Sequence, residues 1–241
     1  MDRAVGHLRN ELRQLGIAED TLVWFTSDNG ASPPGCNGGL RGRKATLWEG
    51  GIRVPTVIEW PARFPEPAVI DVPCGTVDIY PTLLAIAGIE VPEHPPLDGI
   101  DLLPILEERL GERPDPMGFW IYPAPGRVTP SGPLLDALAE RLSAGLPGYD
   151  PEAEGPINPD RRYPRDERPG HAVWLDHPYK LHRVTERGEF HYLLFDLVAD
   201  PAEERNLAEA QPQRVARMKA ELAAWQGEVI DSLNRTDYAD P

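Results

Sequence analysis

Apolar residues recur at helical spacing near both ends of the chain. Close to the amino terminus, apolar side chains three or four positions apart are Val5, Leu8, Leu12 and Leu15. Gly16 follows them, and glycine readily takes the left-handed conformation that ends helices, so this pattern predicts an amphipathic helix that stops there. A longer stripe of the same kind comprises Val215, Met218, Leu222, Trp225 and Val229. It predicts a final helix that packs one face on a sheet.

Short apolar runs between these helices predict strands. In the first half of the chain, Thr21 to Thr26 reads as a buried strand and Ile52 to Trp60 as a second one. The segment from Gly30 to Gly42 between them is rich in glycine and proline and reads as a loop. Asp78 can cap a helix that runs to Gly88. Helix, strand, loop and helix in this order are typical of the end of an α/β domain.

The last seventy residues contain three closely spaced strand patterns. They cover Ala172 to Leu175, Tyr179 to Val184 and Tyr192 to Asp196. Consecutive short strands with brief connections predict an antiparallel sheet. The final helix would cover one face of that sheet.

The middle of the chain has a different composition. Sixteen of the 28 prolines lie between Pro92 and Pro169, and few periodic runs interrupt them. We expect mostly loop, with a strand near Gly118 to Tyr122 and a short helix near Leu134 to Leu146. Loops of this length are often functional, although a linker between two ordered parts gives the same pattern.

Charge and cysteine content narrow the possible partners. Among 241 residues the net charge is -15, which disfavours binding to nucleic acid or to an anionic membrane surface. No apolar run approaches the length of a membrane span, and the amino terminus lacks the apolar core of a signal peptide. Cys36 and Cys74 are not at zinc-ligand spacing, and they could be either free or joined in a disulfide.

Oxygen ligands and cations are concentrated between Thr21 and Pro55. Asp28 and Asn29 follow an apolar strand at its carboxyl end, where open α/β sheets bind ligands. Their adjacent carboxylate and carboxamide could serve one hard divalent cation, although an Asp-Asn-Gly sequence alone is most often a turn. Lys44 offers a compact positive charge for an oxyanion.

The neighbours of Lys44 are also basic. Arg41, Arg43 and Arg53 surround it, and Glu49 is the acid among them. This surplus of positive charge in an acidic chain suggests an oxyanion ligand, and a solvated basic loop is the alternative. For Glu49 and Arg53 we favour a structural ion pair that shapes the loop.

Several segments together identify a family resemblance. SDNG is followed by GRKATLWEGGIRVP, then by DIYPTLLAIAG and LDGIDLLPIL, and near the carboxyl end by LFDLVADPAEERNLA. In this order and spacing they resemble the sulfatase family of the alkaline phosphatase superfamily, the formylglycine-dependent type. The resemblance covers roughly residues 1 to 110 and 171 to 230, and it concerns the carboxyl-terminal portion of such enzymes.

The resemblance implies roles for three residues. Asp28 and Asn29 would ligate a calcium ion, and Lys44 would contact the sulfate group of a sulfated small molecule or carbohydrate. The family's nucleophile is a formylglycine made from cysteine in a Cys-x-Pro-x-Arg segment, and this sequence contains no such segment. Neither Cys36 nor Cys74 fits it. We therefore expect a sulfatase fragment whose catalytic nucleophile lies upstream and which is inactive alone.

The expected fold follows from the same comparison. It is the carboxyl-terminal part of a sulfatase-like α/β sandwich, followed by a smaller α+β domain with an antiparallel sheet and a terminal helix. The expected boundaries are 1–110 for the first part, 111–170 for a proline-rich loop region and 171–241 for the small domain. Family members are usually exported to the periplasm or the extracellular space.

Two other functions remain open at this point. One is phosphodiester or phosphonate hydrolysis by a relative in the same superfamily, and the other is a truncated, non-catalytic binding module. Polar residues on predicted loops that could touch substrate are Arg127, His171 and His177. His7 matches no site position of the family and reads as a solvated or half-buried helix residue.

Overall fold

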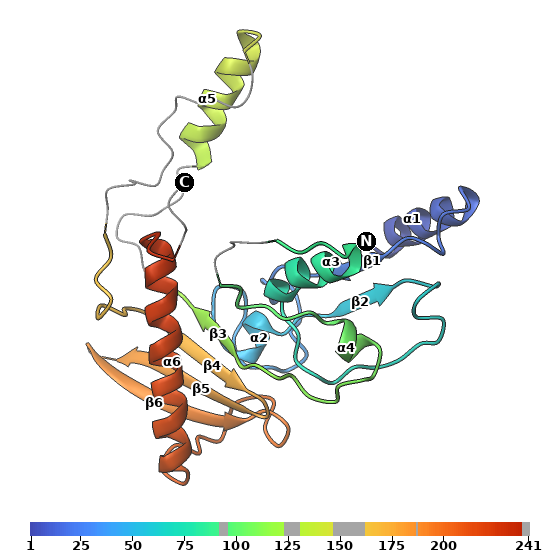
Figure 1. The fold of residues 1–241 in the computed structure, drawn as a ribbon. Helices are drawn as coiled ribbons and strands as arrows, with labels where there is room; N and C mark the ends of the chain where they lie inside the picture. Colours follow the sequence, from blue (N-terminus) through green and yellow to red (C-terminus); the bar gives the residue numbers. More distant parts are fainter. Residues whose placement is uncertain (92–95, 123–130, 147–161, 187, 238–241) are drawn as a thin grey trace.

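The computed structural model describes residues 1–91, 96–122, 131–146, 162–186 and 188–237. In its first half the elements are α1 (Asp2–Gln14), β1 (Val23–Thr26), α2 (Glu49–Ile52), β2 (Thr56–Glu59), the 3-10 turn η1 (Thr76–Asp78), α3 (Ile79–Ala87) and α4 (Leu103–Leu106). In its second half they are β3 (Met117–Trp120), α5 (Ser131–Ser143), β4 (Ala172–Asp176), β5 (Tyr179–Glu186), β6 (Glu189–Asp196) and α6 (Pro212–Leu233). Figure 1 shows their arrangement.

The first two strands form a small antiparallel ladder. β1 pairs with β2 from Val23 opposite Glu59 to Thr26 opposite Thr56. All four residues of β1 are only partly buried, so the buried strand expected at Thr21 to Thr26 is shorter and more exposed than its apolar sequence suggests. The strand expected from Ile52 begins only at Thr56, because Glu49 to Ile52 form the single helical turn α2.

The predicted antiparallel sheet is confirmed. Its order is β3-β4-β5-β6, and every neighbouring pair is antiparallel. The edge strand β3 comes from the proline-rich middle of the chain, so part of the predicted loop region completes this sheet. Together with the helices these strands give a mixed α/β fold, while the three domain boundaries stay a prediction.

The final helix packs on one face of the sheet, as its apolar stripe predicts. Met218 and Leu222 of α6 form a buried cluster with residues of β4, β5 and β6. The buried strand residues in this cluster are Ala172, Trp174, Leu181 and Leu194. Gly118 of β3 lets α6 approach closely, since a Cβ there would lie 2.4 Å from the Trp225 ring. Figure 1 shows α6 crossing the sheet.

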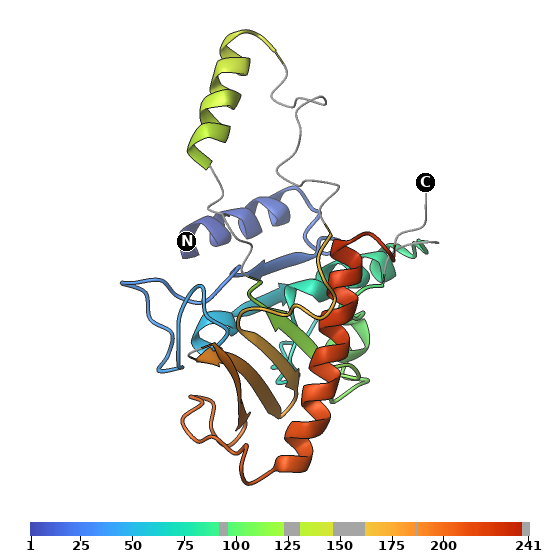
Figure 2. The ribbon, with the colours of Figure 1, turned by 90° about the vertical axis from the view of Figure 1, so that its left-hand side faces the viewer.

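The opposite face of the sheet receives the loop before α2. Side chains alternate along a strand, so Lys180 and His182 of β5 point away from the face that Leu181 presents to α6. On this second face Trp48 packs against a cluster that contains Phe195. Figure 2 shows α2 and α6 on different sides of the sheet.

Asp78 has a larger role than the helix cap predicted for it. It occupies the N-cap position of α3 but makes no side-chain bond to that helix. Its carboxylate accepts hydrogen bonds from both terminal nitrogens of Arg113, at 2.8 and 2.9 Å, and from the backbone of Gly75 and Ile100. Asp78 is fully buried and Arg113 nearly so. This pair connects α3 to the segment that leads into the sheet.

The remaining helices lie further from the core. α1 has no buried residue and contacts β2 through Arg9 and Arg13, whose side chains both pair with Glu59. The helix expected near Leu134 to Leu146 is found as α5, which stands apart from the sheet in Figure 1. Among the described residues, none of the helices combines the length and apolar character needed to cross a bilayer.

Candidate functional site

The turn after β1 presents the two predicted metal ligands at the surface. The Ser27 hydroxyl donates to the carbonyl of Asn29 at 2.9 Å, which closes the turn. Asp28 is exposed and Asn29 half-buried, and the Asn29 amide donates a hydrogen bond to the Asp28 carboxylate. The two side chains therefore touch and could share one ion.

Lys44 lies in a tight loop that is bonded to this turn. Its backbone N–H donates to the carbonyl of Ala31 at 3.1 Å, two residues after Asn29. The Thr46 hydroxyl donates to the carbonyl of Arg43 at 2.7 Å and stabilises the bend. The Lys44 side chain is exposed. The structure thus places the chain segments of Asp28, Asn29 and Lys44 next to each other.

Three glycines make this arrangement possible. The Gly30 N–H donates to the carbonyl of Gly51 at 2.8 Å, and a Cβ on Gly30 would lie only 2.0 Å from the Gly50 carbonyl oxygen. A Cβ on Gly51 would lie 2.2 Å from the carbonyl oxygen of Thr46. Because real side chains do not fit at such distances, the backbones of the turn, the loop and α2 interlock only with glycine.

The donor set suits part of a divalent cation site. Asp28 supplies a carboxylate and Asn29 a carboxamide oxygen, which are ligands that hard cations prefer. Calcium usually takes six to eight oxygens, so these two residues would hold one side of the ion. Within the described ranges, acidic, histidine and cysteine side chains nowhere gather in a group of three that could hold a metal.

The basic residues around Lys44 divide into two kinds. The Arg41 guanidinium lies 3.5 Å from the centroid of the Trp48 ring and donates to the Glu203 carbonyl at 2.9 Å, so it serves the structure. Arg53 lies 4.0 Å from the Glu49 carboxylate, as the predicted ion pair requires, although 60% of its side chain is exposed. Arg43 and Lys44 are exposed and could face a ligand.

A buried charged group lies beneath this loop, and the sequence interpretation missed it. We call it the docking cluster: Glu49 of α2, Lys180 and His182 of β5, and Glu203 from the segment between β6 and α6. Each of these side chains is at most 7% exposed. The local sequence signal for this cluster is a lysine and a histidine, Lys180 and His182, within a predicted strand. That signal does not reveal that their partners are Glu49 and Glu203.

Histidine protonation within the docking cluster is set by burial. His182 lies 2.6 Å from the Glu203 carboxylate through Nε2 and 2.9 Å from His171 Nε2 through Nδ1. Burial, reinforced by the charge of Lys180, lowers the pKa of His182 to about 4 and that of His171 to about 4. Both rings are therefore neutral at pH 7, with His182 donating to Glu203 and accepting from His171.

Glu203 remains ionised in the same environment. Burial alone would raise the pKa of its carboxyl, but the hydrogen bond from His182 and the charge of Lys180 together lower that pKa below its ordinary value. An ionised Glu203 can accept several donors at once. This keeps the docking cluster hydrogen-bonded although it is buried.

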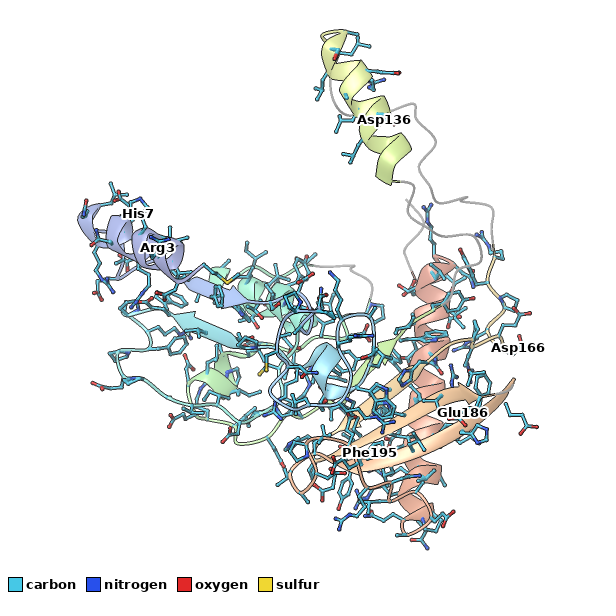
Figure 3. The ribbon with its side chains drawn as sticks, turned by 180° about the vertical axis from the view of Figure 1, so that it is seen from behind. Arg3, His7, Asp136, Asp166, Glu186 and Phe195 are labelled. Carbon is cyan, nitrogen blue, oxygen red and sulfur yellow. The ribbon has the colours of Figure 1, made fainter. Side chains whose placement is uncertain are left out.

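The other candidate residues do not join the site. His171 packs against Trp48 and His182, so its ring serves the docking cluster. His177 lies in the β4–β5 turn, and Arg127 lies outside the described residues. His7 is 77% exposed on α1, as predicted; Figure 3 shows it far from the sheet that carries Phe195. Cys36 and Cys74 are both free and exposed.

Known proteins resemble this chain over part of its length. Residues 1–89 match the family model described as Sulfatase. Human steryl-sulfatase is 44% identical over 117 residues, which are 44% of this chain and 20% of that enzyme. The chain therefore spans about a fifth of this curated relative.

Two groups of solved structures share the fold. Ps i-CgsB in complex with k-i-k-neocarrahexaose has a TM-score of 0.68 at 24% identity, over 94% of this chain and 41% of that one. The phosphonate monoester hydrolase of Agrobacterium radiobacter has a TM-score of 0.54 at 23% identity, over 93% of this chain and 39% of that one. Residues 1–89 therefore match the sulfatase family, the curated relative agrees with that match over part of the chain, and the solved structures show that the fold is shared.

Proposed function

We propose that this chain carries one side of the metal- and sulfate-binding site of a sulfuric ester hydrolase. The observation that supports the proposal most is the interlock between the Asp28 turn and the Lys44 loop. It puts a carboxylate, a carboxamide and an ammonium group on neighbouring segments, bonded through Ala31 and Gly51.

Each group has a definite task in this proposal. Asp28 and Asn29 hold a divalent cation, for which we propose calcium, and the cation would offset negative charge on the ester oxygens. The Lys44 ammonium binds one sulfate oxygen and stabilises the charge that grows as the ester bond breaks. The sequence contains no Cys-x-Pro-x-Arg segment, so we propose that the nucleophile is supplied by sequence outside this chain and that the chain alone does not turn over esters.

The proposed substrates are sulfated carbohydrates or sulfated small molecules. A structural neighbour holds k-i-k-neocarrahexaose, and the curated relative is named for a steryl sulfate, so both classes occur among similar proteins. The exposed position of Lys44 would admit either a sugar or a flat ring system.

Ligand binding to the purified chain tests the proposal. With calcium present, 4-nitrophenyl sulfate or a 6-sulfated glucosamine should bind, and Lys44→Ala should weaken that binding by about 10- to 100-fold, the worth of one charge-assisted hydrogen bond. Arg3→Ala, which removes an equal charge from α1, is the matched control. The proposal fails if neither ester binds, or if turnover occurs that Lys44→Ala leaves unchanged.

Calcium titration tests the proposed metal binding separately from the proposed sulfate binding. Calcium should raise the melting temperature of the chain, and Asp28→Ala should remove that rise while Asp20→Ala, at another exposed position, should not. If calcium does not change the melting temperature, the result favours the alternative that the chain is a non-catalytic module.

A second candidate function is phosphonate or phosphodiester hydrolysis. The shared fold with a phosphonate monoester hydrolase favours it. Tighter binding of a phenyl phosphonate monoester than of the matched phenyl sulfate would select this candidate.

A further inference from the structure

The loop that carries Lys44 is fastened to the carboxyl-terminal sheet at one residue, Glu49. The Glu49 carboxylate accepts a hydrogen bond from Lys180 Nζ at 2.7 Å, and the Glu49 backbone N–H donates to Glu203 Oε2 at 2.6 Å. Lys180 Nζ also lies 3.0 Å from Glu203 Oε1. The first residue of α2 is therefore held through its side chain and its backbone.

Burial makes this attachment hard to replace. Lys180 is fully buried and Glu49 only 7% exposed, so water does not compensate for a lost partner. A buried charge without its partner is strongly unfavourable, whereas an exposed pair contributes little. Lys180 thus forces two acidic residues from distant parts of the chain to meet over β5.

Aromatic packing reinforces the same contact. The Trp48 ring stacks on His182 with centroids 4.2 Å apart and an interplanar angle of 24°. On its other side it carries the Arg41 guanidinium, which also bonds the Glu203 carbonyl. Residues 41 to 49 therefore meet the docking cluster at both ends of the loop.

Backbone hydrogen bonds connect Glu49 to the segments that carry Lys44 and Asp28. Glu49 is followed by Gly50, whose N–H donates to the Arg41 carbonyl at 2.7 Å, and by Gly51, whose carbonyl accepts from Gly30. These bonds fix the loop of Lys44 on one side and the turn of Asp28 on the other. A displacement of α2 would move both.

We propose that Lys180 and Glu203 are positioning residues for the oxyanion site. Through Glu49 they set the place of α2, and α2 sets the distance between Lys44 and the Asp28 turn. The inference rests on the proposed function for its ligand, since the positioned group is Lys44. Neither residue touches the substrate.

Segment-resolved hydrogen exchange combined with sulfate-ester titration tests this role. In Lys180→Met, amides of residues 41–53 should exchange about tenfold faster or more while those of α6 keep their protection. Binding of 4-nitrophenyl sulfate should weaken by about tenfold or more. Lys219→Met, which removes a lysine from α6 that lies over the Tyr192 ring, is the matched control and should change neither readout. Lys44→Ala should weaken binding by about 10- to 100-fold without altering exchange.

Glu49→Gln keeps the proposal testable if Lys180→Met does not fold. It removes one of the two carboxylates that pair with Lys180 and leaves Glu203 in place, so a smaller change of the same kind is expected in both readouts. A folded variant with unchanged exchange in residues 41–53 overturns the proposal. If the unmodified chain binds no sulfate ester, the proposed function fails, while the exchange result still decides whether Lys180 positions the loop.

Discussion

The two halves of this protein differ in how they are held together. In the carboxyl-terminal half, Ala172, Leu181, Leu194 and Met218 are fully buried between a four-stranded sheet and α6. In the amino-terminal half, α1 has no buried residue and β1 pairs only with β2 along the described chain. The residues proposed to bind the metal and the sulfate, Asp28, Asn29 and Lys44, all lie in the amino-terminal half. The comparison teaches that the chemical groups and the rigid scaffold are separate, and that a few buried polar contacts connect them.

The largest effect should come from breaking the Asp78–Arg113 pair. Arg113→Met leaves the fully buried Asp78 carboxylate without its charged partner, and loss of a buried partner costs about 3–5 kcal/mol of unfolding free energy. Urea denaturation measures it. Arg109→Ala, which removes an exposed partner of Glu107, should cost less than about 1 kcal/mol. Equal losses in the two variants would contradict the contrast between buried and surface connections.

The second-largest effect should come from acidification, which should lower the free energy of unfolding by weakening the docking cluster between the two halves. His171 and His182 have pKa values near 4 in the folded protein and near 6.5 when unfolded. Between these values the unfolded chain binds more protons, so the free energy of unfolding decreases as pH falls from about 6.5 to about 4. For the fully buried His182 the loss is at most about 3 kcal/mol. Protonation of Glu203, whose pKa is lowered, adds to the loss at the acid end of this window.

A matched pair of variants assigns this pH dependence. His182→Gln can still donate to Glu203 but does not titrate, so its melting temperature should fall less steeply between pH 6.5 and 4. His7→Gln, which changes an exposed histidine of α1, should follow the unmodified chain. Parallel curves for all three proteins would show that the docking cluster does not control the pH response.

A smaller loss of stability is expected from adding a methyl group where the backbones of Gly30, Gly50 and Gly51 meet, which we call the glycine interlock. Gly30→Ala would place a Cβ 2.0 Å from the Gly50 carbonyl oxygen, and relief of such overlap costs about 1–3 kcal/mol. Calcium and sulfate-ester binding should also weaken because Asp28 moves. Gly6→Ala is the control, since its Cβ meets nothing within 4 Å and it lies inside α1, where it should stabilise by about 0.5–1 kcal/mol. Thermal denaturation with and without calcium distinguishes the two.

The smallest effect should follow from weakening the contact between α1 and β2, where Arg13 also lies 3.8 Å from Glu59. Arg9→Ala removes the side chain that pairs with Glu59 at 2.8 Å across partly exposed surface, which is worth about 0.2–1 kcal/mol. Sodium chloride should reduce the difference from the unmodified chain, because salt screens exposed charges. A loss above about 2 kcal/mol would mean that α1 is packed far more tightly than its exposed residues indicate.

The sequence predicted what local periodicity encodes. The stripe from Val215 to Val229 gave α6 and its packing on the sheet, and the runs after Ala172 gave the antiparallel strands. Lys180 and Glu49 are 131 positions apart, so no local pattern could pair them. Glu203 belongs to a segment recognised by resemblance, yet its bond to the backbone of Glu49 spans 154 positions.

The sequence identified the residues of the candidate site, but it did not predict the backbone contacts that hold them. Asp28, Asn29 and Lys44 were identified from residue types and family resemblance, and their roles stay predictions. In the structure Gly50 and Gly51 come close to other backbone, that of Gly30 and the Lys44 loop. Spacing in the sequence shows that a glycine is needed but not which neighbour requires it.

The glycine interlock limits how such a site can be redesigned. Gly30, Gly50 and Gly51 lie nearest the proposed ligands, yet they leave no room for a new side chain. A library directed at these positions would return mostly defective proteins, however well its substitutions suit a new substrate. Variation aimed at ligand preference belongs instead on the exposed side chains of Ser32 and Cys36, where the outer surface of the loop can change while the inner backbone contacts stay intact.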